Sequence, residues 1–293
     1  MALDHSLVGV PGEPATRSWD GTDALLYALG VGAGAEDPLQ ELAFTTENTE
    51  GVTQQVLPTF AVLAAQARGG PRRRLGDFDP ARLVHAEQSF RLHRPLPVEG
   101  TVTVTSTVTD MLDKGKGALV RTQSRAVDGD GRPLVTATSG AFIMGEGGAG
   151  SVSAERSPDD EPSPGDLPWT RPDREPDHRV VYRTRPDQAL LYRLSGDRNP
   201  LHSDPAFAAR GGFDRPILHG LCTYGFTGRA LLHTLCDSDP ARFHAMYGRF
   251  SRPVYPGDTL VVNVWRDGEG RALFQTQTDK GTVVIDRGVV QHS

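Results

Sequence analysis

Two groups suited to acid–base chemistry lie close together in the stretch SGDRNPLHSDP, residues 195–205. They are the carboxyl group of Asp197 and the imidazole of His202, and Asn199 and Pro200 lie between them. Because Pro200 fixes its own φ and disfavours the α conformation at Asn199, we expect the chain to turn here rather than continue as a helix. Such a turn can aim both side chains into one space, with Asn199 bracing the turn or one of the two groups by hydrogen bonding.

A carboxylate and an imidazole that converge on one water molecule suit the addition of water to an activated double bond. One group takes a proton from the water while the other delivers a proton to the neighbouring carbon, and each transfer is typically worth on the order of 100- to 10,000-fold in rate. The reaction needs an electron sink, normally a carbonyl conjugated with the alkene. Gly220 is expected at the start of a buried helix, where N–H groups are free and the dipole is positive. Its N–H is therefore a candidate donor to a thioester oxygen.

The same residues also suit a turn with no catalytic role, in which His202 only caps or braces the chain. The apolar flanks, ALLYRL before the stretch and PILHGLCTYGF after it, favour the catalytic interpretation. Charged groups are rarely placed among core segments without a partner or a function. Just beyond His202, Asp204 and Pro205 predict an N-cap and a first helical residue for a helix through PAFAAR.

The turn lies in the second of two similar halves. Asp23–Gly30 (DALLYALG) resembles Asp187–Gly196 (DQALLYRLSG), and Arg94–Val104 resembles Arg252–Val264. Two matches in the same order along the chain point to an internal duplication.

A segment rich in Gly, Pro, Ser and Asp, residues 145–178, separates the two halves. It is too poor in apolar residues to bury a core, which is typical of a linker. The predicted organisation is a first repeat at 1–144, a linker at 145–178 and a second repeat at 179–293.

Each half is predicted to contain a buried helix followed by an antiparallel sheet. The helices are expected at 58–68 and at 216–235; Pro216 can open the second, which is apolar nearly all round and should be buried. Alternating apolar and polar residues predict strands at 100–112, 117–127, 133–144, 258–267, 272–279 and 282–291. This pattern indicates an α+β fold in which each sheet wraps its helix. A second sheet that continues the first would cover the free edges.

Composition excludes several classes of protein. The 293 residues are 37% hydrophobic and 23% charged, and a net charge of −6 predicts neither a nucleic-acid nor a membrane partner. The chain shows no signal peptide and no apolar run near the ~18 residues of a membrane span, so a cytoplasmic location is expected. Cys222 and Cys236 lie in an apolar stretch and are expected to be buried free thiols, and no zinc-type Cys/His cluster is present.

The motifs of both halves resemble a known family. GDRNPLH followed by SDP and ILHG resembles the signature of the MaoC-like, type 2 enoyl-CoA hydratases. In the first half, DALLYALGVGA, QVLPTFAVL, VHAEQSFRLHRPLP and VTDMLDKGKGALV resemble the amino-terminal half of the two-domain members. The resemblance covers nearly the whole chain apart from the linker and both tips. It implies a double hot-dog fold with one active site per chain and (R)-specific hydration of 2-enoyl-CoA without cofactor or metal.

The resemblance also implies residue roles. Asp197 and His202 would be the catalytic pair, with Asn199 in support and the Gly220 N–H on the thioester oxygen. Contacts with the acyl-CoA would come from His85, Lys114, Pro200, Leu201 and Phe250.

Structural alternatives remain open for three of these contacts: a core histidine at His85, a solvated turn lysine at Lys114 and a core phenylalanine at Phe250. The chain departs from the family at Ala86, where glycine is common, and its methyl group could narrow the CoA path. Phosphate contacts from Pro71–Arg74 or Arg215 compete with a solvated-loop interpretation.

The first half lacks the Asp–Asn–Pro–His motif, so we expect it to have kept the fold of the repeat and lost the catalytic turn. A short or displaced central helix there would leave room for a long acyl chain. Three alternatives stay open for the function: a 3-hydroxyacyl-[acyl carrier protein] dehydratase, a thioesterase, and a non-catalytic acyl-CoA-binding protein. Homodimerisation is expected because sheets of this kind leave edges and faces to cover.

Overall fold

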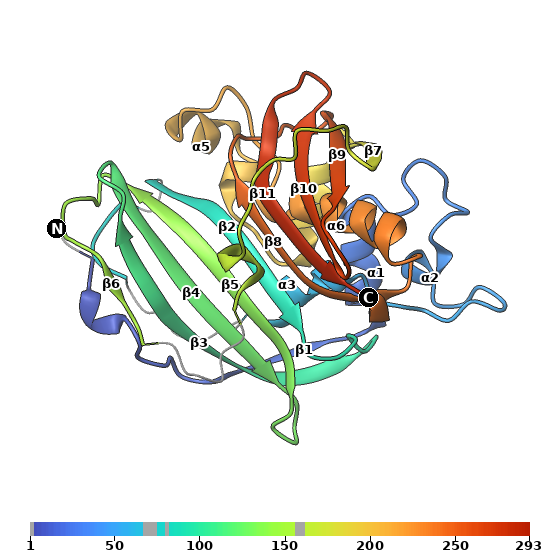
Figure 1. The fold of residues 1–293 in the computed structure, drawn as a ribbon, viewed down its shortest axis with the longest axis horizontal. Coiled ribbons are helices and arrows are strands. Elements are labelled where there is room, and N and C mark those ends of the chain that lie inside the picture. The colour runs from blue at the N-terminus through green and yellow to red at the C-terminus, as the bar shows by residue number, and fades with distance from the viewer. Residues whose placement is uncertain (1–2, 67–74, 80–81, 156–161) are drawn as a thin grey trace.

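The structure is a computed structural model that describes residues 3–66, 75–79, 82–155 and 162–293 (Figure 1). Pro71–Arg74, considered above as a phosphate contact, lie outside the described residues. Within the described residues, no helix combines the length and the apolar character needed to cross a bilayer.

One antiparallel sheet runs through both halves of the chain (Figure 1). It has 11 strands within the described residues. Their order from edge to edge is β1 (Ala15–Trp19), β3 (Gly100–Asp113), β4 (Gly117–Val127), β5 (Pro133–Met144), β2 (Leu83–Leu92), β8 (Phe243–Phe250), β11 (Val283–His292), β10 (Arg271–Thr278), β9 (Thr259–Arg266) and β7 (His178–Arg183), with β6 (Val152–Ser153) paired to β3. The expectation that the second sheet continues the first is confirmed.

The strand order shows the duplication directly. The first half reads β1-β3-β4-β5-β2 from its outer edge to the centre, and the second half reads β7-β9-β10-β11-β8 from the opposite edge. The repeats therefore meet where β2 pairs with β8, Glu87 opposite Arg249 and Arg91 opposite Ala245. All six predicted strands are present, with ends shifted by a residue or so.

The two central strands were not predicted. In β2 the alternation is obscured because Glu87, Gln88 and Ser89 are buried in succession. A strand with neighbours on both sides can bury polar side chains on either face, provided that each finds a hydrogen-bond partner. The apolar/polar period, which marks the other strands, is then lost.

The helices lie on one side of the sheet (Figure 1). They are α1 (Gly21–Gly30), α2 (Leu42–Thr45), α3 (Ala61–Ala64), α4 (Gln188–Tyr192), α5 (Pro205–Arg210) and α6 (Gly220–Leu235). As predicted, α6 is buried over almost its whole length, and it packs against β7, β8, β9 and β11.

Two predicted helix boundaries are wrong. Pro216 does not open α6, because the Leu218 N–H donates to the Val254 carbonyl and holds the preceding residues extended, so the helix begins at Gly220. The helix expected at 58–68 is shorter: a 3₁₀ turn at Pro58–Phe60 leads into α3, which ends at Ala64. This segment packs closely on α6, since a side chain at Gly228 would meet the Thr59 methyl group.

A buried ion pair ties the first half to α6. Arg229 of α6 donates from Nε and Nη2 to the two carboxylate oxygens of Glu41, at 3.0 and 2.6 Å, and from Nη1 to the carbonyl oxygen of Val31. His233, one turn further along, contacts Glu41 Oε1 at 2.8 Å. The Arg229 and Glu41 side chains are only 4% and 12% exposed. The segment before α2 is thus fixed to the central helix of the second half.

The described part of the predicted linker lies against the sheet. Trp169 donates its indole N–H to the Gly288 carbonyl at 3.0 Å. With Leu167 it covers a small apolar cluster on the second half. Although residues 145–178 were expected to bury no core, these two side chains do contribute to one.

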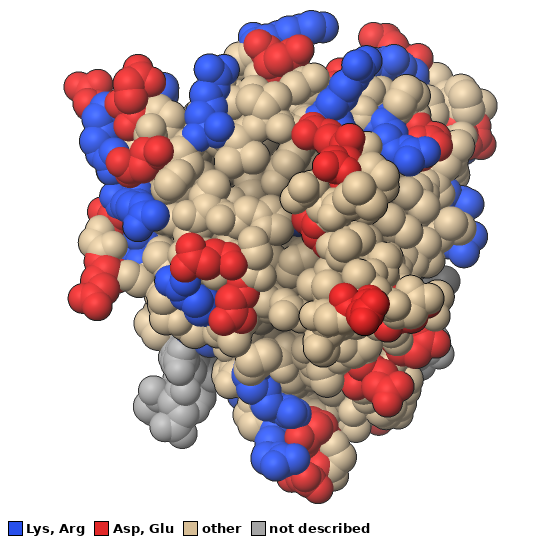
Figure 2. All heavy atoms as spheres, turned by 90° about the vertical axis from the view of Figure 1, so that its right-hand side faces the viewer, with Lys and Arg blue, Asp and Glu red and all other residues tan. Residues whose placement is uncertain are grey.

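Charged side chains are mixed on the surface. On the face shown in Figure 2, Lys and Arg alternate with Asp and Glu around an area without charged residues. The two cysteines, Cys222 and Cys236, are free and buried, as predicted.

Candidate active site

The predicted turn between Asp197 and His202 is present. Asn199 adopts φ −56° and ψ 123°, outside the α region as Pro200 requires, and its Oδ1 accepts a hydrogen bond from Leu201 N–H at 3.0 Å. Asp197 Oδ1 accepts from Asn199 N–H at 3.1 Å. A 3₁₀ turn over Pro200–His202 follows, and Asp204 then caps α5 as predicted. Asn199 therefore braces the turn, one of the two roles considered for it.

Three polar side chains converge at this turn. The polar atoms of Asp197, His202 and His219 lie within 4.8 Å of one another, and the two imidazole rings stack with centroids 3.7 Å apart. Asp197 is exposed, whereas His202 and His219 are 8% and 1% exposed. The carboxyl and imidazole predicted to share one space do so. With His219 they are also the group among the described residues whose ligand atoms are close enough for a metal ion.

Main-chain carbonyls determine the tautomers of both imidazoles. His202 Nδ1 lies 2.9 Å from the carbonyl oxygen of Ile217, and His219 Nε2 lies 3.2 Å from that of Asp197. Because a carbonyl oxygen can only accept, each of these nitrogens carries the proton. In a neutral ring, Nε2 of His202 then holds the lone pair and is available as a base.

Burial keeps both imidazoles neutral. It lowers the pKa of His202 below its ordinary value, although the Ile217 carbonyl and the Asp197 carboxylate act in the opposite direction. The pKa of His219 is lowered further, by burial first and then by the neighbouring His202. The site thus combines an uncharged imidazole pair with an exposed carboxyl group.

Gly220 is the first residue of α6, as required for the predicted oxyanion donor. Within the described residues its N–H has no hydrogen-bond acceptor. A side chain at Gly220 would come within 3.3 Å of the Phe250 ring. Phe250 in turn lies 4.9 Å from the His85 ring, centroid to centroid, so this aromatic pair reaches the helix start.

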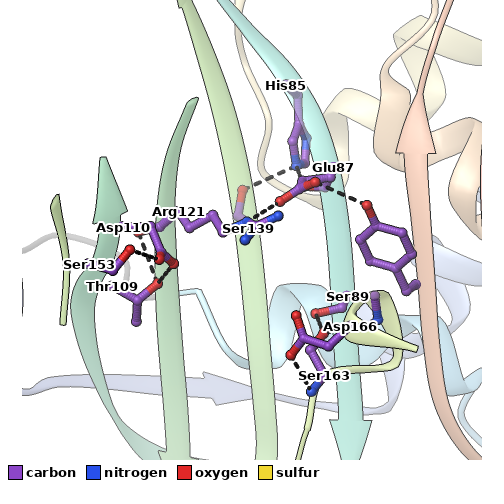
Figure 3. A network of polar contacts seen from close by, with 12 residues as sticks. His85, Glu87, Ser89, Thr109, Asp110, Arg121, Ser139, Ser153, Ser163 and Asp166 are labelled. Carbon is purple, nitrogen blue, oxygen red and sulfur yellow. Dashed lines mark hydrogen bonds and ion pairs between the residues drawn. The ribbon is translucent and has the colours of Figure 1, made fainter. Parts of the chain in front are cut away.

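His85 lies near Asp197 but is hydrogen-bonded within the protein. Its Nε2 donates to the carbonyl of Glu87 at 3.0 Å, and Ser139 Oγ lies 3.1 Å from the same nitrogen (Figure 3). Burial lowers the pKa of His85, while the Asp197 carboxylate acts to raise it, which places the two side chains within electrostatic range.

The remaining residues predicted to contact the acyl-CoA lie in different parts of the structure. Pro200 and Leu201 are part of the turn between Asp197 and His202. Lys114 lies in the exposed turn between β3 and β4, where its main-chain N–H bonds Gly117, and the structure shows no contact between it and Asp197. Arg215 stacks on the Tyr255 ring at 4.7 Å.

His219 was missed as a site residue. The imidazole directly before Gly220 in the apolar stretch PILHG was a usable signal. Its N–H holds the main chain of Asp197 and its ring stacks on His202.

Comparison with known proteins identifies the family of the chain. Residues 169–288 match the model of the MaoC like domain, and residues 18–145 match that of the MFE-2 hydratase 2 N-terminal domain. The chain is 46% identical to 3-hydroxyacyl-thioester dehydratase Y of Mycobacterium tuberculosis, over 100% of this chain and 99% of that protein. It is 38% identical to the peroxisomal enoyl-CoA hydratase 2 of Arabidopsis thaliana, over 99% and 94% of the two chains.

Solved structures show the same fold. The MaoC-like dehydratase from Phytophthora capsici superimposes with a TM-score of 0.86 at 34% identity, covering 100% of this chain and 98% of that one. A double hot-dog protein of Mycobacterium tuberculosis, 15% identical, gives a TM-score of 0.55 over 97% and 96% of the two chains. The α+β, double hot-dog expectation is confirmed, and the chain belongs to the MaoC-like family of two-domain dehydratases and type 2 enoyl-CoA hydratases.

Proposed function

We propose that the protein is a hydro-lyase that reversibly hydrates trans-2-enoyl-CoA to (3R)-3-hydroxyacyl-CoA. Two observations support this: relatives named enoyl-CoA hydratase and 3-hydroxyacyl-thioester dehydratase match over nearly the full chain, and the site holds a carboxyl–imidazole pair beside a free helix N–H. Hydration and dehydration are the two directions of one equilibrium, so both names fit one active site.

His202 and Asp197 carry the proton transfers in this proposal. Neutral Nε2 of His202 takes a proton from a water molecule oriented by the Asp197 carboxylate, and the oxygen of the water bonds to C3 of the alkene. The C2=C3 π electrons move toward the thioester, and the pair returns the proton to C2. The catalysed addition consumes one water and leaves both side chains as they began.

Gly220 supplies the hydrogen-bond donor for the thioester carbonyl, which is the electron sink of the reaction. Negative charge develops on the thioester oxygen as water adds, and the Gly220 N–H at the start of α6 donates a hydrogen bond that stabilises this charge. His219 positions Asp197 and His202 relative to each other, because its Nε2–H donates to the Asp197 carbonyl oxygen and its ring stacks on the His202 ring. His85, Phe250, Pro200 and Leu201 would hold the acyl thioester, and Lys114 would contact CoA from its exposed turn.

The convergence of Asp197 and His202 beside Gly220 is the observation that carries the proposal. The test is loss of the enoyl-thioester absorbance when crotonyl-CoA is mixed with the protein. Release of free thiol without that loss would indicate a thioesterase instead. Binding with neither change would indicate a non-catalytic acyl-CoA-binding protein.

The carrier of the acyl group is the finer question. The relative named for 3-hydroxyacyl thioesters leaves room for a substrate bound to acyl carrier protein. We propose CoA, because the relatives named enoyl-CoA hydratase also match over the full chain. Comparison of kcat/KM on crotonyl-CoA with kcat/KM on the carrier-linked crotonyl group decides between the two.

The rate of hydration should persist as the pH falls to the ordinary pKa of histidine. Because His202 acts as a base, only its neutral form is active, and burial lowers its pKa. We expect kcat/KM for hydration to stay near its maximum at pH ~6.5, the ordinary histidine value, and to fall only at lower pH. A pH–rate profile measures this; a decline already under way above that pH would contradict the assignment.

Two further expectations extend the proposal. The central helix of the first half, α3, is short, as expected for a repeat that accommodates a long acyl chain, and we propose that the chain runs beside the turn that carries Asp197 and His202. Activity on enoyl-CoA substrates of increasing chain length tests this.

A homodimer is proposed because, among the described strands, the edge strands β1 and β7 each pair on one side only, and light scattering tests it.

A further inference from the structure

His85 lies next to an irregularity in the central strand β2. In the pairing of β2 with β5, His85 is opposite Ala141 and Glu87 is opposite Gly140, so Ala86 is an extra residue. Such a β-bulge re-aims the side chains on its two sides. His85 accordingly contacts Phe250 on the helix side, whereas Glu87 contacts Tyr247 and Arg121 and lines a cavity of about 390 Å³ under the linker.

Glu87 is held by both halves of the protein (Figure 3). Its Oε1 lies 2.5 Å from Arg121 Nε on β4, and its Oε2 accepts from the Tyr247 hydroxyl on β8 at 3.0 Å. The Glu87 side chain is only 8% exposed. A carboxylate this buried needs both partners, because leaving such a charge unpaired is costly.

A glycine makes the ion pair possible. Glu87, Gly140 and Arg121 lie in one row across β2, β5 and β4, so the intervening strand separates the two charges. Since Gly140 has no side chain, the Glu87 carboxylate can lie over it and reach Arg121. A Cβ at Gly140 would be 2.4 Å from Glu87 Cγ and would push the carboxylate away.

We propose that Glu87 is a positioning residue for His85, acting from the opposite face of the sheet. Its side chain fixes the backbone at the bulge, and the carbonyl oxygen of that same residue accepts the His85 Nε2–H. The ring is then held against Phe250, which packs on the start of α6. The inference rests on the proposed function in one respect, namely that His85 contacts the acyl thioester.

The predicted effect is on binding rather than on the proton transfers. Glu87→Gln removes the charge that anchors the bulge, and Gly140→Ala keeps every charge but displaces the Glu87 side chain. Both should raise KM for crotonyl-CoA about tenfold while kcat stays within about threefold. Calorimetric Kd for butyryl-CoA, which is saturated and cannot react, should rise by the same factor.

Asp128→Asn is the matched control. Asp128 is a carboxylate paired with Arg94 at 2.6 Å in the same repeat, and it lies in the turn between β4 and β5, away from the bulge. The substitution should lower the melting temperature and leave KM unchanged. If Glu87→Gln behaves in the same way, with lower stability and unchanged KM and Kd, Glu87 has only a structural role and the inference is wrong.

A double-mutant cycle shows whether Glu87 acts through His85. His85→Ala should itself raise Kd for butyryl-CoA, and adding Glu87→Gln should then have little further effect. Full additivity, or an unchanged Kd in His85→Ala, would overturn the inference. The proposed function is tested apart from this: if crotonyl-CoA is not hydrated, that function fails, while the Kd values still test the link from Glu87 to His85.

Discussion

Asp197→Asn and His202→Gln should each lower the turnover of crotonyl-CoA by at least about 100-fold, the lower end for an acid–base group. Asparagine keeps the size of the carboxylate but cannot hold or stabilise a proton in its place. Glutamine in place of His202 removes the basic Nε2. In the wild type, Nδ1 donates to the carbonyl oxygen of Ile217, so Nε2 points away from that carbonyl group. The measurement is the initial rate of enoyl-thioester absorbance loss.

Folding must be shown separately for these variants. Asp197 is exposed, so Asp197→Asn should melt near the wild-type temperature. Asp173→Asn and His178→Gln make the same two chemical changes outside the turn and should keep full activity. Near-normal turnover in Asp197→Asn and His202→Gln would remove the proposed mechanism.

The second large effect is expected on stability. Arg229→Met should lower the free energy of unfolding by about 3–5 kcal/mol, because it leaves the Glu41 carboxylate buried without its main partner. It also removes the bond to the Val31 carbonyl and the stacking of the guanidinium on Tyr182 at 4.5 Å. Urea denaturation followed by circular dichroism measures the change.

A double variant separates the unpaired charge from the lost packing. Glu41→Gln combined with Arg229→Met leaves no buried charge, so it should be less destabilised than Arg229→Met alone. A single-variant loss below about 1 kcal/mol, the range of surface ion pairs, would show that this pair does not hold the halves together.

The same pair predicts how stability depends on pH. Burial by itself would raise the pKa of Glu41, but hydrogen bonds from His233 and Arg229 outweigh it and lower the pKa to about 2. A carboxyl group with a depressed folded-state pKa stabilises the fold above its unfolded value of about 4.3 and loses that contribution as the pH falls toward 2. In this window the wild type should lose stability more steeply than Glu41→Gln.

Local chemistry made much of the site predictable. Pro200 restricts Asn199, and Asp204 followed by Pro205 marks a helix start, so the turn can be derived from neighbouring residues alone. The six alternating strands could be derived for the same reason, since a half-buried strand shows its period in the sequence.

Contacts between distant residues could not be derived in this way. Glu87 meets Arg121 only because β5 places Gly140 between them, and its other partner, Tyr247, comes from the second repeat. The start of α6 depends likewise on a bond from Leu218 to Val254, which no local signal near Pro216 reveals. The family resemblance named His85 but gave no reason for its orientation, which the bulge at Ala86 supplies.

The most direct test of the account is the structure of the Asp197→Asn variant with crotonyl-CoA bound. We predict the thioester oxygen within hydrogen-bonding distance, about 3 Å, of the Gly220 nitrogen, and C3 of the alkene facing Nε2 of His202 across one water molecule. A thioester bound away from the start of α6, or an alkene turned away from His202, would contradict it.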